Sequence, residues 1–250
     1  MGVAKSAILA QRISDADVTR AFTTLGVPWG MMWAFCKPSA GGGAMESMDS
    51  IETLVHVIRE LAADGFSPAT GGNFSMREGL DQFCITASGC DKRRVSVGQF
   101  IRLPVAGALA TTDPLPSAET ALHQRLYRLD PTIGCVLHTH SVAATVLSRL
   151  DPSDTLVLRG YEMQKAIRGQ TTHEATLALP LFDNTQDIPA LADQLAVRWE
   201  AKGGLPGGFL VRGHGLYAWG RTVAEARRHV EGWEFLLNCL LQERLLEARR

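Results

Sequence analysis

The stretch Cys135-Val136-Leu137-His138-Thr139-His140-Ser141 places two histidines two positions apart at the end of an apolar run. Such a run predicts a buried strand. Side chains at positions i and i+2 of a strand point to the same face, so His138 and His140 are expected to project together. Neutral imidazole is a good zinc ligand. Ser141 is a predicted N-cap for a helix over 142–150. A bare pair of this kind more often combines one core histidine with one exposed one, so the interpretation depends on which other residues converge here.

Composition bounds the class of protein. The chain has 250 residues, 46% of them hydrophobic, which favours one large domain with a full core. A net charge of −1 gives no reason to expect a nucleic-acid partner. The apolar run 25–36 is too short to span a bilayer, and no signal-peptide cleavage pattern is evident, so no membrane partner is expected. Five cysteines without C-x-x-C spacing favour a reduced, cytoplasmic protein.

Residues 1–47 differ from the remainder of the chain. The run Gly41-Gly42-Gly43 is typical of a linker. We expect 1–47 to be a poorly ordered N-terminal extension and 48–250 to be the folded catalytic domain, with Met45 or Met48 as conceivable natural starts. Met1-Gly2 with Ser6 fits the minimal myristoylation pattern, which is so permissive that chance explains it.

Strand-like and helical segments are mixed along 48–250 without internal repeats, which predicts an α/β fold with helices on both faces of a sheet. One apolar stripe predicts a helix over 51–62, ended by Gly65. Thr222 and Glu225 form a predicted capping box for a long final helix. Further helices are expected over 117–129 and 188–199, and strands over 83–86, 135–137, 156–158 and 176–182, with two more between 207 and 219.

His214 is the third candidate metal ligand. It lies between Gly213 and Gly215 at a predicted strand break, where the backbone is free enough to aim a side chain. The alternative is an exposed turn histidine. Two histidines on one strand and one on another would form a catalytic zinc site with a position open for substrate. His173, in a predicted loop, is a weaker reserve candidate. The other histidines (56, 123 and 229) fall on predicted helices without metal spacing.

Two glutamates are candidates for acid–base chemistry. Glu119 falls in the first turn of the helix expected from Ser117, where a carboxylate is also favoured by the helix dipole, so simple capping is the alternative. Its functional interpretation is a base or a further metal ligand. Glu162 lies three positions before Lys165, and its alternative is a solvated helix residue in an ion pair.

Three segments could hold an anion. Gly71-Gly72-Asn73 and Ser88-Gly89 offer backbone N–H groups in tight turns, with Lys92 close behind the second, and Ser117 opens a predicted helix. None fits a P-loop, so no nucleotide is indicated. Together they predict a small phosphorylated ligand held by backbone and hydroxyl groups.

These motifs resemble, in order, those of the class II (zinc-dependent) sugar-phosphate aldolases. Glu119 precedes His138 by 19 positions, as in that family, and the resemblance runs from about residue 48 to the C-terminus. It implies a three-layer αβα sandwich around a mostly antiparallel sheet, and a homo-oligomer, commonly a tetramer, with sites near subunit interfaces. It also implies one zinc per subunit on His138, His140 and His214. By resemblance the phosphate-binding residues are Gly72, Asn73, Ser88, Gly89 and Ser117.

Within the family, Gly160-Tyr161-Glu162 and the segment 171–175 are similar to the dehydratases of methionine salvage. That resemblance implies Glu162 as the catalytic acid/base and Glu119 near the metal. The substrate would be a phosphorylated ketose with a ketone at C2 and hydroxyls at C3 and C4. Zinc on the C2 oxygen would acidify the C3 proton, Glu162 would remove it, and water would leave from C4. Ala118 and Cys90 depart from the family pattern, each in a predicted phosphate-binding segment.

Two other functions stay open. A zinc-dependent aldolase or 4-epimerase acting on fuculose or ribulose phosphate would use the same histidines; the segments around Glu162 and 171–175 favour the dehydratase. A non-catalytic interaction domain similar to the adducin head belongs to a different class. The retention of all three histidines favours an enzyme, because a retired site is expected to lose its metal ligands.

Overall fold

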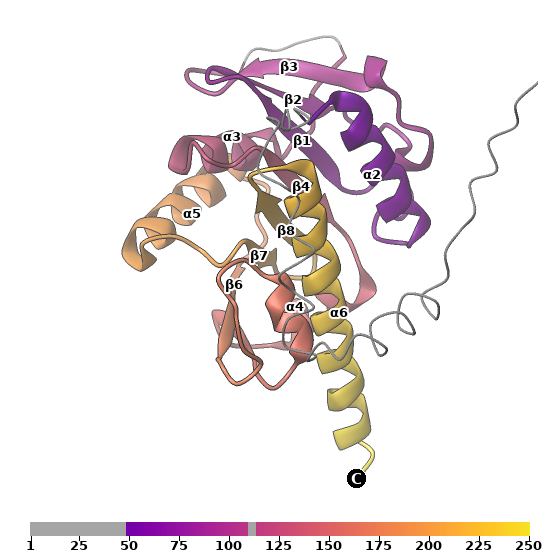
Figure 1. Cartoon of the computed structure of the whole chain (residues 1–250), viewed down its shortest axis with the longest axis vertical. Helices are drawn as coiled ribbons and strands as arrows, with labels where there is room; N and C mark the ends of the chain where they lie inside the picture. The colour runs from indigo at the N-terminus through magenta and orange to yellow at the C-terminus, as the bar shows by residue number, and fades with distance from the viewer. Residues whose placement is uncertain (1–48, 110–113) are drawn as a thin grey trace, which may run out of the picture. The chain divides into compact units, whose positions relative to one another are not determined.

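The computed structural model of the protein describes residues 49–109 and 114–250 (Figure 1). These residues form an eight-stranded sheet in the order β3-β2-β1-β4-β8-β7-β6-β5. Neighbouring strands are antiparallel except β6 and β7, which are parallel. The strands are β1 (Asn73–Glu78), β2 (Gln82–Thr86), β3 (Phe100–Pro104), β4 (Cys135–Thr139), β5 (Thr155–Leu158), β6 (Leu177–Phe182), β7 (Gly208–Val211) and β8 (Gly215–Gly220). The predicted extension 1–47 lies outside the described residues.

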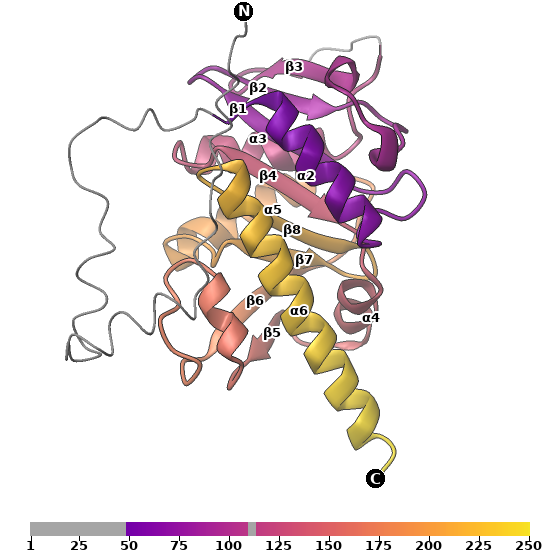
Figure 2. The same ribbon diagram turned by 45° about the vertical axis from the view of Figure 1, so that its right-hand side comes forward.

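Helices cover both faces of the sheet, as Figures 1 and 2 show. One apolar cluster joins the sheet to α2 (Ile51–Ala63), α4 (Val142–Leu150) and α6 (Val223–Glu247). A second cluster joins the opposite face to α3 (Thr120–Leu129) and α5 (Ile188–Lys202). Three short 3-10 helices complete the described elements: η2 (Lys92–Arg94), η3 (Val97–Gln99) and η4 (Glu162–Ala166). The predicted α/β class and three-layer αβα sandwich are confirmed. Among the described helices, none combines the length and apolarity that crossing a bilayer requires.

Strand β4 lies in the middle of the sheet between β1 and β8, and all its residues are buried. Cys135 and Leu137 pack into the cluster beneath α6, while Val136 packs into the cluster beneath α3 and α5. Full burial of one large aliphatic side chain stabilises a fold by about 1.5–3 kcal/mol, so both faces of this strand anchor it. His138 continues the face of Val136, and Thr139 continues the face of Leu137. The strand that carries the histidines is therefore held from both sides.

Hydroxyl side chains cap the first turns of three helices. The Ser50 hydroxyl accepts a hydrogen bond from the backbone N–H of Thr53 and caps α2. The Ser141 hydroxyl caps α4 by accepting from the backbone N–H of Ala144 at 3.0 Å. The Thr222 hydroxyl caps α6 as predicted. The capping box itself is incomplete, because the Glu225 carboxylate accepts from the backbone N–H of Arg221 and from the Arg168 guanidinium instead of closing on Thr222.

Two elements differ from expectation. Helix α3 begins at Thr120 rather than at Ser117, because Ser117 opens a turn: its hydroxyl accepts from the backbone N–H of Glu119, and its carbonyl accepts from that of Thr120. Strand β3 was not predicted. It pairs only with β2, and its short alternation of buried and exposed residues ends at Pro104, which is typical of an edge strand.

Candidate active site

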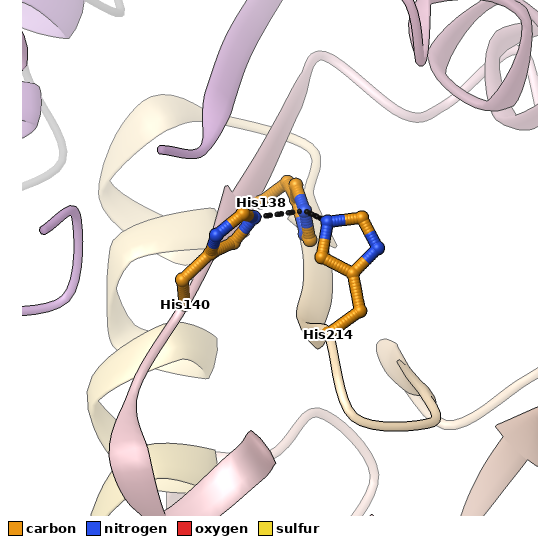
Figure 3. Close-up of side chains that lie close together, drawn as sticks. All are labelled: His138, His140 and His214. Atoms are coloured by element: carbon orange, nitrogen blue, oxygen red, sulfur yellow. Dashed lines mark hydrogen bonds between the residues drawn. The ribbon is translucent and has the colours of Figure 1, made fainter. Parts of the chain in front are cut away.

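Three histidines converge at one end of the sheet (Figure 3). His138 lies in β4, His140 just past its end, and His214 in the turn between β7 and β8. The Nε2 atom of His138 is 2.8 Å from Nε2 of His140 and 3.4 Å from Nε2 of His214. One ligand atom of each residue lies within 4.8 Å of the others. The structure therefore brings together the three residues predicted as metal ligands.

The protonation of His138 is set by its other ring nitrogen. Its Nδ1 lies 2.9 Å from the backbone carbonyl of Leu216, which can only accept, so Nδ1 carries the proton. Nε2 then presents a lone pair to the other two histidines, the arrangement that fixes the tautomer of metal-binding histidines. The ring also stacks on Tyr217, with centroids 3.9 Å apart. A backbone carbonyl and an aromatic face thus hold His138 in one orientation.

The pKa values of buried His138 and half-buried His140 are both lowered, which favours the neutral imidazole. Burial, and then the charges of His140 and His214, keep the pKa of His138 well below its ordinary value. Burial, and then His214, lower the pKa of His140 to about 4. Lone pairs gathered this closely repel one another unless a cation lies between them. A tetrahedral zinc with Zn–N bonds of 2.0–2.1 Å separates its ligand nitrogens by about 3.3 Å, so small side-chain adjustments would accommodate one ion. The donor set fits zinc.

Glycines allow neighbouring backbone to pack against the histidines. A Cβ on Gly215 would lie 2.0 Å from the carbonyl oxygen of Thr139. Gly72 has a φ of +78°, and a Cβ there would lie 2.5 Å from the carbonyl oxygen of His138. At both positions the backbone can therefore approach β4 this closely only without a side chain.

Glu119 lies beside the histidines instead of capping α3, whose N-cap residue it is. Its Oε1 atom is 3.0 Å from Nε2 of His214, and its Oε2 atom is 3.4 Å from Nε2 of His138. Oε2 also accepts a hydrogen bond from Nδ2 of Asn73. A carboxylate here can orient the histidines or join them on a metal.

A chain of buried polar side chains leads from the core to Glu119. The Tyr127 hydroxyl and Nδ1 of His123 each lie 2.7 Å from the Ser75 hydroxyl. Nε2 of His123 contacts Oδ1 of Asn73, whose amide nitrogen donates to Glu119. His123 is wholly buried in α3, and β1 supplies Ser75 and Asn73. These hydrogen bonds thus connect the core beneath α3 to the histidine cluster.

The donor-to-acceptor direction of these hydrogen bonds follows from Glu119, the last residue of the series. The Glu119 carboxylate accepts, so Asn73 turns its NH2 group to Glu119 and its oxygen to His123. Nε2 of His123 must then donate. Burial lowers the pKa of His123 to about 3, so its ring is neutral and Nδ1 accepts from Ser75. Tyr127 in turn donates to Ser75. Every hydrogen bond points toward Glu119, and bonds aligned in this way strengthen one another.

The opposite side of β4 is anchored on α6. Thr139, between the two histidines in sequence, donates from its hydroxyl to Oε1 of Glu234 at 2.8 Å. Burial raises the pKa of Glu234 to about 7, although the Ser141 and Thr139 hydroxyls act in the opposite direction. This buried carboxyl therefore fixes the residue that separates the paired ligands.

A pocket of about 470 Å³ opens beside the histidine cluster. His140, His214 and Glu119 line it, as does Ala118. All five residues predicted to hold phosphate also line it: Gly72, Asn73, Ser88, Gly89 and Ser117. Lys92 and the segment 184–186, which follows β6, complete one side. One cavity therefore combines two of the three predicted metal ligands with the predicted anion-binding turns.

Glu162 lies outside this pocket. It begins η4, its side chain is 71% exposed, and its carboxylate contacts Nζ of Lys165 at 2.5 Å and Nδ1 of His173 at 3.3 Å. Lys165 holds the pKa of this carboxyl below its ordinary value. The reserve candidate His173 is thus a partner of Glu162 and takes no part in the histidine cluster. Within one chain, the structure does not bring Glu162 to the proposed metal.

Sequence reasoning missed two parts of the site. His123 is predicted only as a helical residue without metal spacing, although its position four residues after Glu119 is the spacing that aligns side chains along a helix. The segment 184–186 carries only common loop residues, so no local signal marks it. It reaches the pocket because β6 ends beside β7, which leads to His214.

Comparison with known proteins gives the class to which this fold and site belong. The family model described as the class II aldolase and adducin N-terminal domain matches residues 52–241, and the chain belongs to this family. The predicted family is confirmed.

Particular relatives are similar over most of the chain. Methylthioribulose-1-phosphate dehydratase from Serratia proteamaculans (strain 568) is 53% identical over 206 residues, which cover 82% of this chain and 100% of the relative. The protein of the same name from Pectobacterium carotovorum subsp. carotovorum (strain PC1) is 52% identical over 205 residues, with the same coverage. The crystal structure of L-fuculose-1-phosphate aldolase from Thermus thermophilus matches with a TM-score of 0.63 and 25% identity, over 78% of this chain and 95% of that one. The predicted resemblance to the family's dehydratases is confirmed.

Proposed function

We propose that this protein is a hydro-lyase that converts 5-methylthioribulose 1-phosphate to 2,3-diketo-5-methylthiopentyl 1-phosphate and water, a step of methionine salvage. The observation that carries the proposal is the single pocket that combines converging histidines with phosphate-binding turns. The relatives called methylthioribulose-1-phosphate dehydratase are identical at about half of the aligned positions over 82% of the chain. They support dehydration over the other reactions that such a pocket allows.

We propose that His138, His140 and His214 hold one Zn²⁺ per subunit. When bound, the ion would supply a Lewis acid for the C2 carbonyl oxygen, which makes the C3 proton more acidic. The chain prepares for it with neutral imidazoles, since burial lowers the pKa of both His138 and His140. Glu119 is proposed to orient these ligands, because its two oxygens face His214 and His138.

The phosphate end of the substrate is assigned to the other wall of the pocket. Gly72 and Gly89 both have a positive φ and line the cavity together with Ser88 and Ser117. The backbone N–H groups of these turns and the two serine hydroxyls are the donors proposed for phosphate. The Asn73 amide contributes its remaining N–H, since one is already donated to Glu119. Phosphate held there fixes the distance between C1 and the histidines, so that C2 faces the cluster.

Glu162 is proposed as the acid/base, acting in the pocket of a neighbouring subunit. It would take the proton from C3 and return a proton to the C4 hydroxyl, which leaves as water; the resulting enol relaxes to the diketone. General acid–base help of this kind accelerates a reaction by roughly 10²–10⁴. The side chain of Glu162 is 71% exposed. Exposed apolar side chains lie near it and near the histidines: Met163 is its neighbour in sequence, and Val142 lies two residues past His140. These features support an interface between copies.

A homotetramer in the cytoplasm is the assembly and location that we propose. The described cysteines, 84, 90, 135 and 239, all carry free thiols, which supports a reducing compartment.

The experiment is a comparison of substrates with purified protein. We expect release of water from methylthioribulose 1-phosphate, followed through the diketone product, and no comparable cleavage of fuculose or epimerisation of ribulose phosphates. Cleavage of fuculose 1-phosphate without dehydration would favour the aldolase, and zinc-loaded protein inactive on every substrate would favour a non-catalytic interaction domain.

A further inference from the structure

Lys92 places a buried positive charge in the wall of the pocket. It is the first residue of η2, and only 2% of its surface is exposed. It is also the only lysine or arginine among the described residues that line the pocket. Arg93 and Arg94, which follow it, are exposed and do not contribute to that lining. The positive charge of this cavity, apart from any bound metal, therefore comes from one side chain.

The ammonium group of Lys92 is held by carbonyl oxygens. Nζ donates to the backbone oxygens of Thr70 and Cys90, both at 2.9 Å. An ammonium has three N–H donors, so one remains without a partner among the described residues. No carboxylate within that part of the chain forms an ion pair with it; Glu119, in the same pocket, is directed to the histidines and Asn73. Lys92 is thus a buried charge without a counter-ion.

Such a charge is costly to bury. Buried ionised groups in proteins are normally paired, because carbonyl dipoles replace only part of the hydration that an ammonium loses. A fold tolerates the cost where a ligand supplies the opposite charge. The field of this charge also reaches the histidines, since Lys92 contributes to lowering the pKa of His140. The missing counter-charge is therefore expected inside the pocket, within reach of Nζ.

The two carbonyls belong to the two turns assigned to phosphate. Thr70 directly precedes Gly71-Gly72-Asn73, and Cys90 directly follows Ser88-Gly89. By bonding both, Nζ fixes the separation of these turns. Gly71 packs against His140, where an added Cβ would lie 2.8 Å from Nδ1 of that ring. The same contacts therefore tie the anion-binding turns to the metal site.

We propose that Lys92 is the residue that pairs with the substrate's phosphate dianion and sets the spacing of the two turns that enclose it. This inference rests on the proposed function for the identity of the substrate. The buried charge indicates an anionic ligand, and the adjoining turns with their backbone N–H and hydroxyl groups favour a phosphate monoester. A neutral side chain at this position would leave the turns without their charged partner. A phosphate bound there would be held by a charge-assisted hydrogen bond, which is roughly twice as strong as a neutral one.

The test is a titration with inorganic phosphate, read as the rise in thermal midpoint, with chloride added to hold ionic strength constant. Wild type is compared with Lys92→Gln, which keeps amide N–H donors but has no charge, with Lys92→Met, which has neither, and with Lys92→Arg, which keeps the charge. Lys202→Gln, at the exposed end of α5, is the matched control for removal of a positive charge. The readout needs no turnover.

We expect the phosphate concentration for half-maximal stabilisation to rise by roughly 10- to 100-fold in Lys92→Gln and Lys92→Met, the range for loss of a hydrogen bond to a charged group. Lys92→Arg should recover part of the affinity, and Lys202→Gln should match wild type. A glutamine variant that binds phosphate like wild type would overturn the proposal. Lys92 would then only join the two turns through its hydrogen bonds to Thr70 and Cys90.

If neither uncharged variant folds, the test uses NMR of wild-type protein with ¹⁵N-labelled lysine side chains. Phosphate should shift the signal of one buried lysine amine, and the absence of any shift would overturn the proposal. Phosphate binding that depends on Lys92, in a protein that does not dehydrate methylthioribulose 1-phosphate, would refute the proposed function while this inference stands.

Discussion

Substitution of His123 tests the buried chain of hydrogen bonds most strictly. His123→Ala removes the donor to Oδ1 of Asn73 and the acceptor for the Ser75 hydroxyl, at a position with no exposed surface. Each buried group left unpaired costs about 1–3 kcal/mol, and the vacated ring volume adds a packing loss. The free energy of unfolding should therefore fall by about 3–5 kcal/mol.

A second effect distinguishes this chain from ordinary core packing. Without His123, the Asn73 amide is free to rotate and no longer holds its NH2 group against Glu119. Glu119 contacts two of the proposed zinc ligands, so its orientation bears on the metal. Loss of such an outer contact typically lowers metal affinity by about 10- to 100-fold. We expect a loss of zinc affinity in that range for His123→Ala, measured by competition with a chelator. Denaturant unfolding of the metal-free protein would measure the loss of stability separately.

His229 offers a matched control on α6. It is 1% exposed, its Nδ1 donates to the carbonyl of Trp219 at 2.6 Å, and its Nε2 accepts from the backbone N–H of Arg168 at 3.0 Å. None of these residues lines the pocket. His229→Ala should therefore lose a similar amount of stability and keep wild-type zinc affinity. Equal losses of zinc affinity in both variants, or none in His123→Ala, would refute the reasoning.

Three further predictions concern the carboxylates and the N-terminus. Glu162→Gln should lower kcat by about 10²–10⁴ with zinc retained, whereas Glu119→Gln should act mainly on zinc or substrate affinity; normal turnover by Glu162→Gln would transfer the proton step to Glu119. A chain that begins at Met45 should keep its activity and thermal midpoint, since the family match starts at residue 52; a large loss in either would show that the removed residues pack on the core. Burial raises the pKa of Glu234 from 4.5 to about 7, so stability present below pH 4.5 is lost as pH rises through 7. Glu234→Gln should remove up to about 3 kcal/mol of that loss between pH 4.5 and 8, measured by chemical unfolding, and an unchanged pH profile would contradict the assigned burial.

Features that depend on short stretches were predictable from sequence. The i, i+2 rule correctly predicted that His138 and His140 project together, although β4 ends at Thr139 and His140 lies just past it. Ser141 marked the following helix because a capping hydroxyl needs only its own next turn. The alternating strands and helices were enough to predict a layered α/β fold. Glycines on both sides of His214 correctly indicated a break between two strands.

Features that depend on the register between distant strands were not predictable in this way. Asn73 faces His138 because β1 and β4 are paired at those positions, and no local pattern in either strand states that register. The role of His123 follows from the same pairing, which brings Ser75 and Asn73 under α3. The misplaced helix start at Ser117 has a local cause instead, because its turn hydrogen bonds to the backbone N–H groups of Glu119 and Thr120 use the same residue type that caps a helix. Glu162 was singled out by resemblance, and within one chain it forms the exposed ion pair with Lys165 that was predicted as its alternative.

Zinc-dependent turnover tests the central claim most directly. Metal-free protein would be titrated with zinc while dehydration of methylthioribulose 1-phosphate is followed, with His214→Ala as the comparison. The account predicts that activity rises from nearly zero and saturates at one zinc per chain, and that His214→Ala neither binds the ion tightly nor turns over. Full activity in the chelated protein, or saturation that His214→Ala leaves unchanged, would contradict it.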